Sequence, residues 1–248
     1  MKKTGWGKSS KWYNQIVGES GHYYHRHLIM PAVLPLLSLK PQESVLDLGC
    51  GQGVLARALP EDILYTGVDI SGALINQAKR LDTNPQHHFI AADVSRQIPL
   101  KQKFDHVVMI LALQNIQNIA GVFDTINSCL NSTGNLILVL NHPCFRIPRQ
   151  TGWLTDTGEK LQRRWINRYM LPMEIPVDTH PSQRSSHKTW SFHYPLSTLV
   201  SETNRIGLGI TALMELVSDR ESAGTYQKME NRSRAEIPLF MVIEAKRQ

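Results

Sequence analysis

Glycine residues alternate along one short stretch of the sequence, at Gly49, Gly51 and Gly53. Glycine lets the backbone turn sharply and approach a ligand closely, where a side chain would collide with it. The residues that follow predict a helix, whose first N–H groups would be free to bind a polar ligand. Many strand-to-helix turns are rich in glycine for packing reasons alone. This stretch therefore indicates a binding site only together with other residues.

Three carboxylates accompany this turn, each at the end of a predicted strand. Asp47 precedes the glycines, Asp69 ends the next predicted strand, and Asp93 ends the third. A carboxylate can accept a hydrogen bond from each hydroxyl of a ribose, which suits Asp69, whereas Asp93 could accept one from an adenine amino group. Each Asp alone could equally be a helix cap or a solvated loop residue. Their joint spacing is difficult to explain in that way, and it indicates a site for a nucleoside.

The elements that would position these residues alternate between strands and helices. Hydrophobic runs predict strands at 44–48, 64–70, 88–92, 104–113, 136–140, 210–217 and 238–245. Helices are predicted at 54–59, from Ser71 as N-cap to residue 81, at 121–130 and at 196–206. Such alternation implies a mostly parallel sheet covered by helices on both faces, with ligands at the carboxyl ends of the strands. The last two strands could form a hairpin joined by a long loop.

Two segments do not follow this alternation. Residues 12–39 predict short helices outside the main sheet, so we expect residues 1–41 to form an N-terminal helical lid. Residues 142–194 are rich in Pro, Trp, His and Arg, lack clear periodicity, and are too long for an ordinary connection. We predict that they form an insertion that recognises the substrate, within a main domain spanning residues 42–248.

Composition limits the class of protein. The chain has 248 residues, a net charge of +6 and a pI near 9.3, which would favour anionic partners without proving any. The longest apolar stretches, 107–113 and 136–140, are far shorter than the roughly 20 residues of a membrane-spanning helix. Residues 1–5 have no apolar run behind them, so we expect no secretory signal and a cytoplasmic protein without membrane contact.

Residues 45–53 (VLDLGCGQG) resemble the first motif of class I S-adenosylmethionine-dependent methyltransferases. Asp47 distinguishes this motif from the fingerprint of nicotinamide-dependent dehydrogenases. In that family the acid before the glycines helps to hold the methionine amino group, the glycine turn lies against methionine and ribose, the second acid takes the ribose hydroxyls, and the third meets adenine. The resemblance implies S-adenosylmethionine as cofactor, S-adenosylhomocysteine as product, and contacts from Asp47, Gly49, Cys50, Gly51, Asp69 and Asp93.

The resemblance covers residues 42–141 and, by topology only, residues 195–248. It implies an α/β fold with a seven-stranded, doubly wound, mostly parallel sheet whose last strand is antiparallel. Residues 104–116 resemble the fourth strand and the loop that faces the methyl donor, which includes Leu111. Ile70 and Val94 would form an apolar slot for adenine. In the lid, Tyr24 and His25 could close over the cofactor.

Methyl transfer is an in-line displacement on an activated carbon, so the protein must mainly align the acceptor and exclude water. A dedicated catalytic residue is not required. His142 follows the fifth predicted strand and is a candidate general base for a hydroxyl or an acidic carbon. The alternative is a structural histidine that hydrogen-bonds its own loop. The loop after the fourth strand lacks the Asn/Asp-Pro-Pro-aromatic motif of methylation at exocyclic amino groups, which favours methylation on O or C.

The acceptor is predicted to be a small molecule, which could be anionic. Arginines lie among aromatic residues in the insertion, a mixture that suits a phosphate, a carboxylate or RNA, or else a solvated charged face. Stretches 141–149, 190–193 and 230–234 resemble a group of uncharacterised bacterial methyltransferases. A tRNA or rRNA methyltransferase, a non-catalytic S-adenosylmethionine-binding protein and a nicotinamide-dependent oxidoreductase are the alternatives. His22, His25 and His27 lack a carboxylate at ligand spacing, so no metal is predicted.

Overall fold

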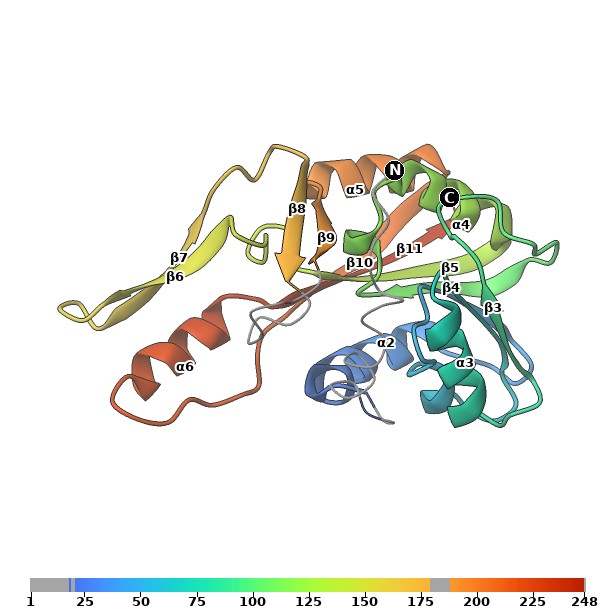
Figure 1. The fold of residues 1–248 in the computed structure, drawn as a ribbon, viewed down its shortest axis with the longest axis horizontal. Helices are drawn as coiled ribbons and strands as arrows, with labels where there is room; N and C mark the ends of the chain where they lie inside the picture. Colours follow the sequence, from blue (N-terminus) through green and yellow to red (C-terminus); the bar gives the residue numbers. More distant parts are fainter. Residues whose placement is uncertain (1–17, 19–20, 179–187, 248) are drawn as a thin grey trace.

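The computed structural model describes residues 18, 21–178 and 188–247. Its central element is a seven-stranded sheet with the strand order β10-β11-β5-β4-β1-β2-β3 (Figure 1). The strands are β1 (Ser44–Leu48), β2 (Leu64–Asp69), β3 (His87–Ala91), β4 (Phe104–Ile110), β5 (Leu130–Asn141), β10 (Leu208–Leu216) and β11 (Phe240–Arg247). Strands β5, β4, β1, β2 and β3 run parallel to one another, whereas β11 runs antiparallel to both β5 and β10. The predicted sheet, its antiparallel last strand and the terminal hairpin are confirmed.

Apolar side chains on both faces of the sheet form two cores. Val107 points into the core that contains α4 (Ile119–Cys129) and α5 (Leu196–Arg205). Its neighbour Val108 points into the opposite core, which contains α2 (Met30–Leu37) and α3 (Gly72–Leu81). Alternate residues of a strand face opposite sides, so a strand covered on both faces becomes a continuous apolar run. The predicted helices on both faces are confirmed.

The helix after the first strand is much shorter than predicted. Only a 3₁₀ turn, η2 (Ala56–Ala58), forms where the sequence indicates a helix over 54–59. Gly53 has a φ of +76°, and Pro60 cannot continue a helix, so too few residues remain between them for a stable helix. By contrast, the helix predicted from Ser71 is present, and the Ser71 Oγ accepts a hydrogen bond from the Leu74 N–H at 3.4 Å.

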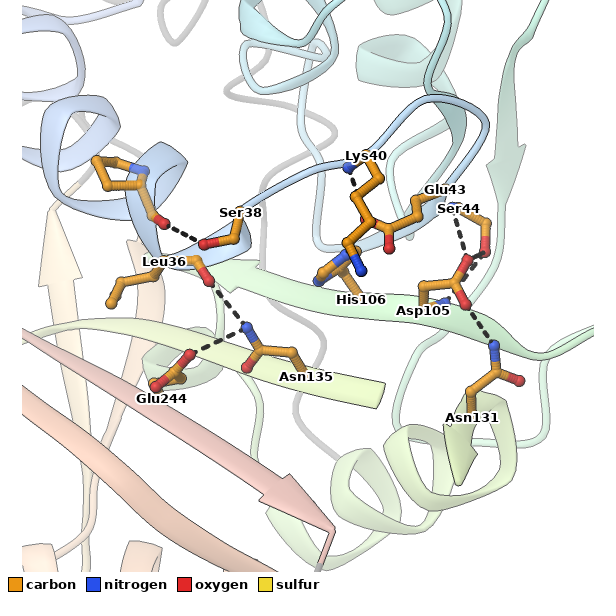
Figure 2. A network of polar contacts seen from close by, with 11 residues as sticks. Leu36, Ser38, Lys40, Glu43, Ser44, Asp105, His106, Asn131, Asn135 and Glu244 are labelled. Carbon is orange, nitrogen blue, oxygen red and sulfur yellow. Dashed lines mark hydrogen bonds and ion pairs between the residues drawn. The ribbon is translucent and has the colours of Figure 1, made fainter. Parts of the chain in front are cut away.

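The described part of the N-terminal segment packs against the sheet. It forms a short π-helix, η1 (His25–Ile29), followed by α2. The Asn135 amide nitrogen on β5 donates to the Leu36 carbonyl at 3.1 Å and to Glu244 on β11 at 3.2 Å, which ties α2 to two strands (Figure 2). Residues 30–37 are thus a layer of the core. The lid over residues 1–41 stays a prediction, and residues 1–17, 19 and 20 of it lie outside the described part.

A polar network holds together the amino ends of β1 and β4 (Figure 2). Asp105 accepts hydrogen bonds from the Ser44 N–H at 2.9 Å, the Ser44 hydroxyl at 2.7 Å and the Asn131 amide at 2.8 Å. Burial raises the pKa of Asp105, but these hydrogen bonds outweigh burial and hold the pKa below its usual value. The network lies at the opposite edge of the sheet from the carboxyl strand ends, so it sets register and stability.

Replacing Asp105 with alanine should lower the free energy of unfolding by about 2 kcal/mol, because hydrogen bonds to a charged group are lost. A carboxylate whose folded pKa is depressed stabilises the protein above its unfolded pKa, and that stabilisation disappears as pH falls through the folded pKa. Urea unfolding should therefore show a gap between the two proteins at neutral pH that narrows in acid. Asp62→Ala, with no side-chain bond among the described residues, is the control and should unfold like the wild type. If the difference in free energy of unfolding between the wild type and Asp105→Ala stayed constant in acid, the stabilising role of the ionised Asp105 would be contradicted.

The segment between β5 and α5 contains two antiparallel strand pairs that the sequence does not reveal. They are β6 (Thr151–Asp156) with β7 (Leu161–Ile166), and β8 (Met173–Asp178) with β9 (Lys188–His193). A helix, α6 (Gln227–Glu236), also occupies the predicted loop between β10 and β11. The β6–β7 hairpin and α6 extend away from the sheet (Figure 1). The prediction of an irregular segment is wrong in this respect, because strands largely exposed on both faces show no hydrophobic alternation.

Candidate functional site

The glycine turn follows β1 at the carboxyl edge of the sheet. Gly49, Gly51 and Gly53 have φ angles of +80°, +57° and +76°, which side chains other than glycine rarely adopt. A Cβ atom on Gly49 would lie 2.4 Å from the Cβ of Ala112, in the loop after β4. The turn therefore needs glycine for its backbone angles and for contact with that loop.

Asp69, the last residue of β2, is bound to this turn. One carboxylate oxygen accepts the Gly51 N–H at 3.0 Å and the other accepts the Ser71 N–H at 2.8 Å. Burial raises the pKa of Asp69, and the two backbone hydrogen bonds act in the opposite direction. Each carboxylate oxygen has a further lone pair, so the group can still accept hydrogen bonds from a diol. The structure thus brings Asp69 to the glycines, as the sequence predicts.

Asp47 lies almost completely buried beneath the same turn. One of its carboxylate oxygens accepts the Tyr65 hydroxyl at 2.8 Å, and the other, Oδ1, is buried without a partner. Burial raises the pKa of Asp47 to about 7, against the hydrogen bond from Tyr65, and the nearby charge of Asp69 raises it further. A buried acceptor without a partner suits a cationic donor such as an ammonium group. This acceptor fits the ammonium group at the methionine end of S-adenosylmethionine.

The raised pKa of Asp47 predicts how stability depends on pH. A carboxyl group whose folded pKa lies above its unfolded value stabilises the protein fully below the unfolded pKa, and this contribution is lost as pH rises through the folded pKa. Between pH 5 and 7, the free energy of unfolding of the wild type should therefore fall relative to that of Asp47→Asn, by at most about 1.4 kcal/mol per pH unit. Asn keeps an acceptor for Tyr65 and cannot ionise. Urea unfolding of both proteins across this range measures the difference, and identical pH profiles would contradict it.

The residues predicted to contact adenine lie at the ends of β2 and β3. Ile70 is 56% exposed directly after β2, whereas Val94 is buried after β3. One oxygen of Asp93 accepts the N–H and the hydroxyl of Ser95, at 3.0 and 2.7 Å, and the other lies 3.4 Å from Arg96. These bonds also fit the alternative of a capping residue. Contact of these residues with adenine stays a prediction.

Leu111 and Cys50 take different places around the turn. Leu111 follows β4 with a φ of +52°, which ends the strand earlier than predicted, and its carbonyl accepts hydrogen bonds from Gln114 and Asn115. The Cys50 thiol is buried in the core, where burial raises its pKa far above the usual value. Cys50 could therefore contact a cofactor only through its backbone.

The N-terminal segment meets the glycine turn. The Gly18 carbonyl accepts a hydrogen bond from the Gln52 amide, and a Cβ on Gly21 would touch both Val54 and His25. Burial lowers the pKa of His25 to about 4, so its imidazole is neutral. His25 thus lies next to Gly21, close to Val54 after the turn, and its role in covering a cofactor stays a prediction. Sequence reasoning did not identify the contact made by Gln52.

Tyr24 points in another direction. Its ring meets Phe240 edge to face at 5.6 Å, and its hydroxyl lies 3.3 Å from the Ser218 hydroxyl. The guanidinium of Arg220 lies 5.5 Å from the same ring. The contacts of Tyr24 are therefore with the loop after β10 and the start of β11, and its role in covering a cofactor stays a prediction.

A hollow, partly open to solvent, lies where β4, β5 and β9 end. Its lining is mostly apolar with a few polar groups, as is common in sites for small molecules. Leu113 and Gln114 line it from the loop whose Ala112 meets Gly49, so one loop contacts both the glycine turn and the hollow. Arg146 and His193 also line it. The sequence indicates Arg146 only as one of the insertion arginines that suit an anionic group, and it gives His193 no role.

Residues 21–211 match a family described as a methyltransferase domain. The chain belongs to this methyltransferase family. Uncharacterized methyltransferases of Mycobacterium bovis and Mycobacterium tuberculosis are 29% identical to it over 116 residues. That match covers 46% of this chain and 57% of each relative, so the chain spans little more than half of their length.

Solved structures of methyltransferases share the fold. An S-adenosylmethionine-dependent methyltransferase from Mesorhizobium loti has a TM-score of 0.70 and 24% identity, over 88% of this chain and 96% of that one. The complex between the Haloferax volcanii Trm112 methyltransferase activator and a methyltransferase has a TM-score of 0.65 and 14% identity, over 99% of both chains. At such identities the likeness shows the fold. The predicted family and its class I fold are confirmed.

His142 of this methyltransferase-family chain lies buried at the end of β5. Its Nδ1 accepts the Cys144 N–H at 3.2 Å, so Nε2 carries the hydrogen and donates to Glu215 at 2.6 Å. Burial lowers the pKa of His142, although the bond to Glu215 acts in the opposite direction. Both nitrogens are engaged, an arrangement that fits a structural histidine. The role of general base stays untested.

Among the described residues, no group of three or more His, Cys, Asp or Glu could hold a metal ion. No helix within the described ranges is both long and apolar enough to cross a bilayer.

Proposed function

We propose that this chain is an S-adenosylmethionine-dependent methyltransferase that methylates a small molecule on oxygen or carbon. The observation that carries the proposal is the loop after β4. Its Ala112 packs against Gly49 of the glycine turn, while Leu113 and Gln114 line the hollow. A cofactor bound at the turn and an acceptor bound in the hollow would therefore both contact this one short loop and lie next to each other.

The cofactor would supply a methyl group activated by its sulfonium. Asp47 Oδ1 would accept from the methionine ammonium, and both oxygens of Asp69 would accept from the ribose hydroxyls. The backbone of the glycine turn would approach the part of the cofactor between its ammonium group and its ribose. Leu111 would lie beside the sulfonium that carries the methyl group. Adenine would contact Ile70, Asp93 and Val94, with Tyr24 and His25 as the cover.

The protein's main task would be to align the acceptor and to exclude water. Where a hydroxyl must lose its proton, His193 is better placed than His142. The His193 Nε2 lies 2.7 Å from the Tyr169 carbonyl, which can only accept a hydrogen bond. Nε2 therefore carries the hydrogen, and the His193 Nδ1 keeps a lone pair. Burial lowers the pKa of His193, which keeps the imidazole neutral and able to take a proton. His142 could act as a base only if the hydrogen bond from the Cys144 N–H to its Nδ1 opened, because Nε2 carries the hydrogen.

Three arginines of the insertion, unlike Arg146, have partners within the protein, which favours a small acceptor over RNA. Arg163 is paired with Asp156 and with Glu159, and Arg149 lies 3.8 Å from Asp178. Arg164 donates to the Phe145 carbonyl. These side chains are engaged within the protein, whereas an RNA-binding face presents free cations to phosphates. The hollow also distinguishes the proposal from a non-catalytic binding protein, which needs no place for an acceptor.

The test is methyl transfer by the purified protein from S-adenosylmethionine labelled in its methyl group. Parallel reactions contain the small-molecule fraction of a bacterial extract or total RNA. We expect label in the small-molecule fraction, and no label when Asp69→Ala replaces the wild type. Label confined to RNA would support an RNA methyltransferase instead. No label in either, from a protein that binds S-adenosylhomocysteine, would support a non-catalytic role.

A further inference from the structure

We propose that the acceptor carries an anionic oxygen group, which Arg146 binds, together with a hydroxyl or amino hydrogen, which Gln114 binds. This inference rests on the proposed function, because it assigns the hollow to the acceptor. It goes beyond that function by naming two recognition residues and the chemistry that each selects. Neither residue belongs to the proposed cofactor site.

Arg146 has a guanidinium that no described residue neutralises. It lines the hollow, and its Nε is buried without a hydrogen-bond partner. Among the described residues, no carboxylate lies within 4.0 Å of its guanidinium. Burial lowers its pKa to about 10, and the nearby charge of Arg164 acts in the same direction, whereas Tyr24 raises the pKa and Arg234 lowers it again. The surroundings are therefore desolvated and positive.

A buried charge without a partner is costly, and a planar guanidinium binds carboxylate or phosphate oxygens well. An anionic group in the hollow would supply the missing partner. Arg149, three residues further along the chain, differs in both respects. It lies near Asp178 and does not line the hollow.

Gln114 provides the second point of recognition. Its amide nitrogen donates to the Leu111 carbonyl at 2.9 Å, which fixes the orientation of the side chain amide. The amide oxygen is then an acceptor, and it is buried without a partner. Such an oxygen selects a molecule that can donate a hydrogen bond. Because Gln114 belongs to the loop that meets the glycine turn, the donor it holds would lie on the cofactor side of the hollow.

The experiment uses protein saturated with S-adenosylhomocysteine and four probes, 4-hydroxybenzoate, its neutral amide 4-hydroxybenzamide, benzoate and phenyl phosphate. Binding is measured by calorimetry up to about 10 mM, a range that detects weak ligands. The variants are Arg146→Gln, Gln114→Leu and the matched control Arg149→Gln, which removes the same charge from the same segment. Thermal melting checks that each variant is folded.

We expect 4-hydroxybenzoate to bind at least about tenfold more tightly than its amide in the wild type and in Arg149→Gln. This preference should disappear in Arg146→Gln, and the preference for 4-hydroxybenzoate over benzoate should disappear in Gln114→Leu. Tighter binding of phenyl phosphate than of benzoate would identify the anion as a phosphate, and the reverse order would identify a carboxylate.

Equal binding of the acid and its amide by the wild type would overturn the inference, and so would binding of neither probe. This comparison needs no variant, so it remains decisive if Arg146→Gln does not fold. Failure of the wild type to bind S-adenosylhomocysteine would contradict the proposed function instead. Normal cofactor binding without anion preference would contradict only the role of Arg146.

Discussion

Asp69→Ala is expected to weaken the binding of S-adenosylhomocysteine by about 100-fold, measured by calorimetry. The variant removes the carboxylate proposed to accept from both ribose hydroxyls, and two charge-assisted hydrogen bonds together contribute about 3 kcal/mol. It also removes the acceptor that holds the Gly51 N–H at 3.0 Å and the Ser71 N–H at 2.8 Å. The turn that faces the cofactor therefore loses its support as well.

A matched control separates this effect from a general loss of charge. Glu61 is exposed in the loop before β2, at the opposite end of the strand that Asp69 terminates. Glu61→Ala should bind S-adenosylhomocysteine like the wild type. Asp69→Asn tests the carboxylate itself, because asparagine retains one acceptor oxygen and should weaken binding less than alanine. Equal affinity of Asp69→Ala and the wild type would remove Asp69 from the site.

Gly49→Ala should have the second large effect, on folding as well as on binding. The φ of +80° is strained for alanine, and the new Cβ would lie 2.4 Å from the Cβ of Ala112. Left-handed strain and overpacking together should cost about 3 kcal/mol in the free energy of unfolding. Since Ala112 lies in the loop next to the hollow, relief of the clash would also move the residues proposed to bind the acceptor molecule.

The control for this variant is Gly72→Ala, in the first turn of α3. A Cβ there would meet no atom within 4 Å, and alanine favours a helix. Its free energy of unfolding should equal or slightly exceed that of the wild type in urea. If Gly49→Ala were as stable as Gly72→Ala, the contact between the turn and the loop after β4 would not constrain the backbone.

The sequence predicts the sheet well, because its signals are local. The apolar run of β1, the glycines after it and the Ser71 cap each depend on residues close in the chain. The predicted helix over 54–59 fails for a local reason too, since Gly53 and Pro60 leave it too little length. Asp69 could be assigned to the glycine turn because parallel strands end at one edge of a sheet.

The candidate acceptor site depends on contacts that no local pattern reveals. His142 is hydrogen-bonded to Glu215, which comes from the distant strand β10. The sequence therefore could not show that the His142 ring already has a partner. Arg146 looks like other arginines of the insertion until the structure shows which of them have partners. The strands β6 and β7 escape prediction because a short, exposed hairpin carries little hydrophobic signal, and β9 escapes it because several of its buried residues are polar.

The most direct test of the account is calorimetric titration of the folded wild-type protein with S-adenosylmethionine, S-adenosylhomocysteine and, separately, a nicotinamide dinucleotide. We predict saturable binding of the first two with dissociation constants on the order of micromolar, and no binding of the dinucleotide. Folded protein that binds neither S-adenosyl compound, or that binds the dinucleotide instead, would contradict the central claim that the glycine turn, Asp47 and Asp69 form an S-adenosylmethionine site.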